Sequence, residues 1–95
     1  MKSIFKLFAF SLLSLQFALA QSTVTGVVTD PDGLPLPGAT VFELGTSNGI
    51  SSDFDGNYSI EVAKGATLVF SFIGYEPQQI LIENQSNLNV QLAMG

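Results

Sequence analysis

The feature that most constrains the fold of this chain is an alternation of apolar and polar residues that begins at Tyr58. In the segment 58–62 every second side chain is apolar, and after a Lys64-Gly65 turn the segment 67–72 repeats the pattern with Leu68 and Phe70. Successive side chains of a β-strand point to opposite faces, so a period of two predicts strands with one buried face. This block therefore predicts packed β-structure and carries no catalytic motif.

Similar runs, separated by turn signals, continue through the rest of the chain. One such signal is the segment 30–33, Asp-Pro-Asp-Gly, in which Pro presets the second turn position and Gly takes the fourth. The predicted strands are 23–29, 39–44, 50–52, 58–62, 67–72, 78–82 and 87–92. Seven short strands without helical periodicity predict an all-β fold, a seven-stranded antiparallel β-sandwich of two sheets.

The first 20 residues have the pattern of a cleaved signal peptide. Lys2 and Lys6 flank an apolar run that spans 7–19, and Ala18-Leu19-Ala20 has the small-x-small form of a cleavage site. We therefore expect an exported protein, whose mature part, residues 21–95, is one small domain.

Removal of that segment leaves a strongly acidic domain. All eight Asp and Glu residues lie after position 20, and Lys64 is the only basic residue there. Non-specific binding to nucleic acids or anionic membranes depends on clustered Lys and Arg. The composition therefore excludes nucleic acid as a partner.

Few side chains are available for chemistry, because histidine and cysteine are absent. Asp53 and Asp55 open an Asp-x-Asp-Gly segment, which begins many calcium loops, but the twelfth position, where an EF-hand has glutamate, is Lys64. In the structural interpretation, Asp53 accepts backbone N–H bonds across the turn and Gly56 is left-handed. We expect no catalytic residue, no cofactor and no metal, with Asp53 and Asp55 as a weak calcium candidate only.

Three aromatic residues are candidates for stacking on sugar rings: Phe42, Phe54 and Tyr75. Aromatic residues in strands usually belong to the core. Tyr75 lies at a turn beside Gly74 and Pro77, so we expect it to be the most exposed of the three.

Four segments in this order resemble the carboxypeptidase-D regulatory-like domain: 24–30, 33–41, 53–60 and 68–75. Within that family, the segment 65–75, Gly-Ala-Thr-Leu-Val-Phe-Ser-Phe-Ile-Gly-Tyr, is most similar to the N-terminal extension of TonB-linked outer-membrane receptors of the SusC/RagA type. The resemblance implies a prealbumin-like (transthyretin-like) sandwich with an immunoglobulin-like Greek key. It also implies a position in the periplasm before the plug and barrel of an importer of oligosaccharides or peptides, and no catalytic residues.

The leading functional hypothesis is a non-catalytic periplasmic extension, or fragment, of such a receptor. It would contact the receptor's plug and barrel, or other periplasmic and outer-membrane proteins, by strand addition at edge strands near Thr23 to Thr29 or Asn87 to Leu92. The alternative is a free-standing secreted accessory or glycan-binding module of a carboxypeptidase or glycan-degrading system. The sequence leaves open the contact surface, the oligomeric state and the substrate of any parent receptor.

Overall fold

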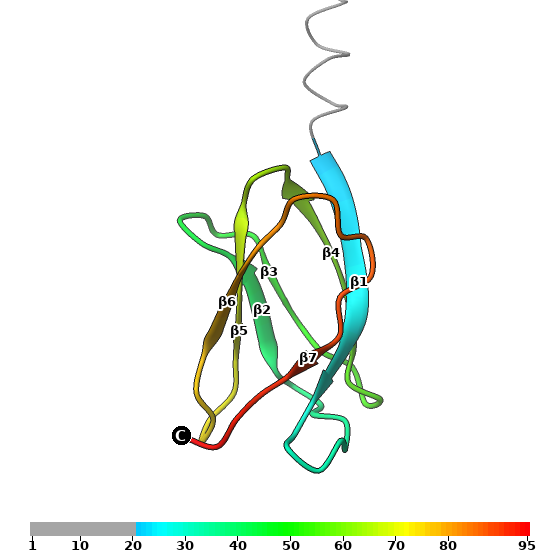
Figure 1. The fold of residues 1–95 in the computed structure, drawn as a ribbon, viewed down its shortest axis with the longest axis vertical. Helices are drawn as coiled ribbons and strands as arrows, with labels where there is room; N and C mark the ends of the chain where they lie inside the picture. The colour runs from blue at the N-terminus through cyan, green and yellow to red at the C-terminus, as the bar shows by residue number, and fades with distance from the viewer. Residues whose placement is uncertain (1–20) are drawn as a thin grey trace, which may run out of the picture.

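The computed structural model describes residues 21–95, which form seven strands in two sheets packed face to face (Figure 1). The predicted signal peptide, residues 1–20, lies outside the described residues. Within residues 21–95, no helix has the length and apolar character needed to cross a membrane.

The first sheet has the strand order β4-β1-β7, and the second has the order β3-β2-β5-β6. β1 pairs antiparallel with β4 from Gln21↔Ala63 to Val27↔Asn57, whereas β7 runs parallel to β1 through the pair Val28↔Val90. The strand pairs of the second sheet are antiparallel. The strands are β1 (Gln21–Thr29), β2 (Thr40–Glu43), β3 (Gly49–Ser51), β4 (Asn57–Ala63), β5 (Thr67–Ser71), β6 (Gln78–Leu81) and β7 (Val90–Gln91).

The predicted strand count and the two-sheet sandwich are confirmed, but two details differ. We expected antiparallel strands throughout, yet β7 is parallel to β1 because the chain crosses from β6 in the second sheet to β7 in the first (Figure 1). We also expected an edge strand near Thr23 to Thr29. This was wrong, because β1 lies between β4 and β7, whereas β7 does end its sheet as expected.

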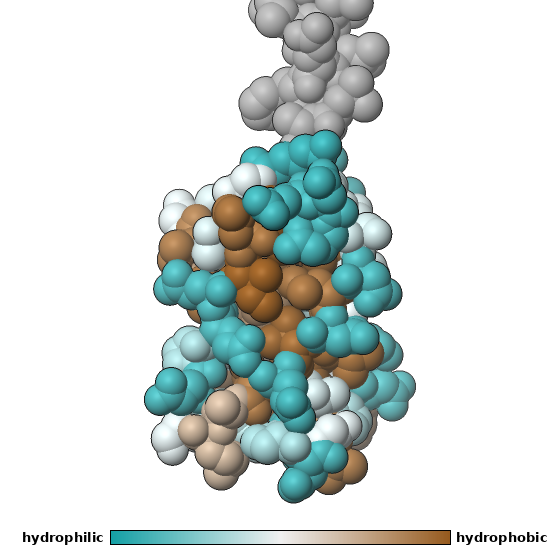
Figure 2. All heavy atoms as spheres, in the orientation of Figure 1, coloured by the Kyte–Doolittle hydropathy of each residue, from teal (hydrophilic) through white to brown (hydrophobic). Residues whose placement is uncertain are grey.

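The core lies between the sheets, and one face of each strand packs into it. In β4, Tyr58, Ile60 and Val62 are buried while their neighbours are exposed, as the alternation predicted. The Tyr58 ring meets the Phe70 ring edge-on across the core, with 5.3 Å between ring centroids. Figure 2 shows apolar residues at the surface in the middle of the face in view, in the area between β6 and β1 in Figure 1.

The connection from β6 to β7 runs alongside β1, parallel to it, and comes closest to it at Gly26. Leu88 donates its N–H to the Thr25 carbonyl at 2.7 Å, and a Cβ on Gly26 would lie only 1.9 Å from the Leu88 carbonyl oxygen. The Tyr58 hydroxyl donates to that same oxygen. Burial raises the pKa of Tyr58 to about 12. This close approach therefore requires the absence of a side chain at position 26.

Ser52 is a buried polar residue that sequence reasoning did not single out. Its hydroxyl donates to the Leu36 carbonyl and accepts the Ala39 N–H at 2.9 Å. These two bonds hold the proline-containing connection 34–38 against the start of β2. They also satisfy two backbone groups that would otherwise be buried without a partner.

Candidate functional site

The candidate calcium turn, Asp53 to Asn57, is closed by its own first residue. The Asp53 Oδ1 atom accepts the N–H groups of Asp55 and Asn57, both at 2.9 Å. Gly56 has φ +76° and donates its N–H to the Asp53 carbonyl. This is the geometry that the structural interpretation predicted, a tight turn whose left-handed position takes glycine.

A second turn, Asp30 to Leu34, has the same Asp-x-Asp-Gly design. The Asp30 Oδ1 atom accepts the N–H groups of Asp32 and Leu34, both at 2.9 Å, and Gly33 has φ +84°. The motif therefore occurs twice with the same bonds, in which the first Asp of each turn uses its carboxylate and the second, Asp32 or Asp55, uses only its backbone N–H.

The calcium hypothesis for Asp53 and Asp55 stays a prediction. Within residues 21–95, no three His, Cys, Asp or Glu side chains come together as a metal-ligating group. One oxygen of Asp53 is already engaged by two N–H groups, and a calcium ion takes 6–8 oxygen ligands.

The three candidate aromatic residues are not exposed in the expected order. Phe54 is 93% exposed at the corner of its turn, whereas Tyr75 is half-buried and packs against the core. The expectation that Tyr75 would be the most exposed was therefore wrong. Phe42, in β2, is also half-buried.

Tyr75 is covered because the turn that contains it folds back on itself. Its N–H donates to the Phe72 carbonyl, and the two rings lie 5.8 Å apart at an angle of 41°. The rings line a shallow hollow of about 370 Å³ that also includes Thr40 and Ser71. Tilted rings do not form the flat platform that stacks on a sugar.

Four loops meet at the end of the sandwich opposite Gln21, which we call the distal end (Figure 1): 30–38, 53–56, 72–77 and 93–95. Of the six large apolar side chains that are exposed among the described residues, four lie in these loops. They are Leu34 (61% exposed), Phe54 (93%), Ile73 (94%) and Met94 (66%). The other two, Leu44 and Leu81, are about half-exposed and lie toward the opposite end of β2 and β6.

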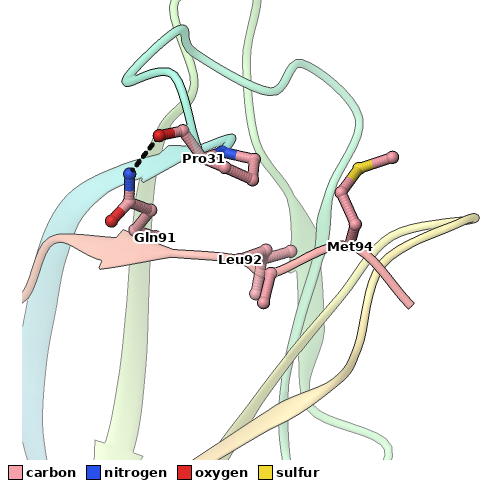
Figure 3. Close-up of a pocket in the computed structure, with 5 residues that line it drawn as sticks. Pro31, Gln91, Leu92 and Met94 are labelled. Carbon is pink, nitrogen blue, oxygen red and sulfur yellow. Dashed lines mark hydrogen bonds between the residues drawn. The ribbon is translucent and has the colours of Figure 1, made fainter.

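The last described residues tie the distal loops together. The Gln91 side-chain amide donates to the Pro31 carbonyl at 2.9 Å, beside a hollow of about 180 Å³ that Leu92 and Met94 also line (Figure 3). On the other side, the Glu76 N–H donates to the Ala93 carbonyl at 2.8 Å. The segment 91–95 therefore bridges loops that belong to both sheets.

The distal end is also acidic. Its loops carry five carboxylates, those of Asp30, Asp32, Asp53, Asp55 and Glu76. Lys64, the only basic residue within 21–95, lies in the turn between β4 and β5 at the opposite end, because Ala63 pairs with Gln21. The exposed apolar side chains are thus surrounded by negative charge without a neighbouring cation from residues 21–95.

Sequence reasoning named Phe54 but missed Leu34, Ile73 and Met94 as surface residues. A usable signal was present, because each of the three is next to a turn glycine or to Gly95. A turn needs the glycine for its backbone conformation but does not need an apolar neighbour.

Residues 24–95 match the family model described as the CarboxypepD_reg-like domain. The chain belongs to this family. It is homologous to the N-terminal region of SusC-type TonB-dependent receptors.

Two of these relatives are TonB-dependent receptor P39 of Formosa agariphila and TonB-dependent receptor SusC of Bacteroides thetaiotaomicron. The chain is 42% identical to P39 over 87% of its own length and 40% identical to SusC over 92%. It spans only 8% of the length of P39 and 9% of that of SusC.

Solved structures support the sandwich fold alone. A chain in the crystal structure of an N-terminal interface mutant of a type II cohesin–X-dockerin complex from Acetivibrio cellulolyticus gives a TM-score of 0.64 at 21% identity, covering 78% of this chain and 58% of that one. 3-Chlorocatechol 1,2-dioxygenase from Rhodococcus opacus gives 0.56 at 11% identity, covering 79% and 60%.

Proposed function

We propose that this CarboxypepD_reg-like domain is a non-catalytic, periplasmic N-terminal extension, or a fragment, of a TonB-dependent outer-membrane receptor for nutrient uptake, and that it acts through protein–protein contacts. The observation that carries the proposal is the similarity to P39 and SusC over nearly the whole chain, while the match covers less than a tenth of either receptor.

The chemistry of the chain supports a role without catalysis. Histidine and cysteine are absent from the sequence, so Ser-His and Cys-His catalysis are excluded. The carboxylates of Asp30 and Asp53 hold turns by accepting backbone N–H groups. Tyr58, whose pKa is raised by burial, lies in the core, where its hydroxyl donates to the Leu88 carbonyl.

The periplasmic location rests on the proposed signal peptide, residues 1–20. Cleavage after Ala20 would leave a mature chain that begins at Gln21. Mass spectrometry of the mature N-terminus is the direct check, and a mature chain that still starts at Met1 would contradict the cleavage.

The proposed function is tested by fractionating native cells and immunoblotting with an antibody against residues 21–95. We expect an outer-membrane band roughly ten times larger than this chain, because the match covers 8% of P39. A small soluble periplasmic band would instead favour the free-standing accessory module. A cytoplasmic band would contradict both.

A further inference from the structure

We infer that the distal end is the surface by which this domain docks on the rest of a TonB-dependent receptor, and that the receptor surface it meets is both cationic and apolar. The inference rests on the proposed function and adds to it the contact surface and the chemistry of the partner.

The first argument is the exposure of apolar side chains that the fold does not use. Phe54 and Ile73 stand at the corners of two closed turns. The Asp53 carboxylate closes the first by accepting two backbone N–H groups, and the Tyr75 N–H closes the second by donating to the Phe72 carbonyl. Burying such a side chain is worth about 1.5–3 kcal/mol, and that burial is still available to a partner. Single exposed apolar residues are common, but four of six on one end form a concentration that is typical of an interface.

The second argument is charge. The exposed apolar side chains share the distal end with five carboxylates, and no basic residue within 21–95 lies among them. A partner surface of the same sign would be repelled, so two copies of this domain are unsuited to meet end to end. A surface with Lys or Arg around apolar residues is complementary to it.

The third argument is the path of the chain. The N–H of Gly95 donates to the Gly74 carbonyl at 3.0 Å, and Tyr75 and Met94 form an antiparallel bridge. In a relative such as SusC, where the homologous region is N-terminal, the polypeptide that follows this position must leave from the distal end. The receptor body is thereby held close to Ile73 and Met94 at a high effective concentration, so even a modest contact would be occupied.

The experiment measures by biolayer interferometry how tightly the purified full chain binds purified P39 from which the 84-residue matching segment has been removed. Phe54→Ser combined with Ile73→Ser should weaken binding by about tenfold, since residues at the centre of an interface carry most of its energy. Leu44→Ser combined with Leu81→Ser is the matched control, which removes two exposed apolar side chains toward the opposite end and should leave binding unchanged.

Charge is tested separately with Asp32→Asn combined with Asp55→Asn. These two residues take part in the turn bonds through their backbone N–H groups, so the turns stay closed. The variant should bind several-fold more weakly at about 50 mM NaCl and should depend less on salt than the wild-type chain.

Three results would overturn the inference: wild-type binding absent up to about 100 μM, equal weakening by the distal and control pairs, or binding that strengthens with salt. Binding that is lost equally in both pairs would leave the proposed function intact and move the contact elsewhere. The proposed function itself fails only by the fractionation result, which does not depend on any surface variant.

Discussion

Replacing Gly26 by alanine should destabilise the domain by about 2–4 kcal/mol, although alanine usually stabilises a strand relative to glycine. The new Cβ would lie 1.9 Å from the Leu88 carbonyl oxygen and 2.6 Å from its carbon, which are backbone atoms that no rotamer change can move. The segment around Leu88 must therefore shift away from β1.

The magnitude follows from the bonds that this shift breaks. The Thr25 N–H donates to the Ser86 carbonyl at 3.0 Å, the Leu88 N–H donates to the Thr25 carbonyl at 2.7 Å, and the Tyr58 hydroxyl donates to the Leu88 carbonyl. Each bond is worth about 1 kcal/mol net, and a buried group left without a partner costs more. The entropic advantage of alanine, about 0.4–1 kcal/mol, offsets only part of the loss.

The assay is urea denaturation followed by circular dichroism, since the chain has no tryptophan. Gly65→Ala is the matched control: Gly65 has φ +84°, and a Cβ at this position would meet no atom within 4 Å beyond its chain neighbours, so only backbone strain of about 1 kcal/mol is expected. Tyr58→Phe should cost about 1 kcal/mol alone and less in the Gly26→Ala background, where its bond is already broken. A Gly26→Ala protein as stable as the wild type, or additive effects in the double variant, would refute the reasoning.

Three further outcomes are expected. Ser52→Ala should cost about 1–3 kcal/mol in urea denaturation, because it leaves the buried Ala39 N–H without its partner, whereas Ser51→Ala at the exposed neighbouring position should be neutral. The pKa of Tyr58 is about 12 in the folded domain against 10.0 for the free side chain, so the unfolded chain loses this proton first. The contribution of protonated Tyr58 to the free energy of unfolding should therefore be fully present below about pH 10 and should fall as the pH rises toward 12. Tyr58→Phe should remove that part of the pH dependence. Asp53→Ala should lower the melting temperature equally with calcium and with a chelator, since two backbone bonds are lost; a calcium-dependent rise in the wild type that disappears in the variant would instead establish a calcium site.

The parts of the fold that could be predicted from the sequence are those governed by neighbouring residues. The alternation in β4 appears directly in the burial of Tyr58, Ile60 and Val62, because one face of the strand meets the core and the other meets water. The positive φ of Gly33 and Gly56 was equally predictable, since each follows an Asp-x-Asp motif whose first carboxylate closes the turn.

What could not be predicted depends on contacts between distant segments. The periodicity of 87–92 identifies the face of β7 but not its direction or its partner, because both depend on the pairing of this segment with the distant strand β1. The hydroxyl of Ser52 reaches Leu36, 16 residues earlier in the chain, and nothing near Ser52 in the sequence indicates that it is buried.

The candidate site was partly predictable for the same reason. Turn chemistry places Tyr75 near a corner, but the bond from its N–H to the Phe72 carbonyl brings the first and fourth residues of the turn together and leaves Ile73 outside. A turn signal alone does not tell which of its residues the core can reach. The sequence therefore indicated an exposed aromatic residue in the wrong loop.

In the two Asp-x-Asp-Gly turns, the residues that form the turn differ from the residue that is available for contact with a partner. In both turns the first Asp supplies the carboxylate that accepts two N–H groups and the glycine supplies the left-handed backbone. The second position is Pro31 in one turn and Phe54 in the other, so the geometry accepts very different side chains there. Proline suits this position because its φ is preset. A phenylalanine that is 93% exposed adds nothing to the turn and lowers the solubility of the protein. The fold therefore does not explain Phe54, and a partner that buries it would.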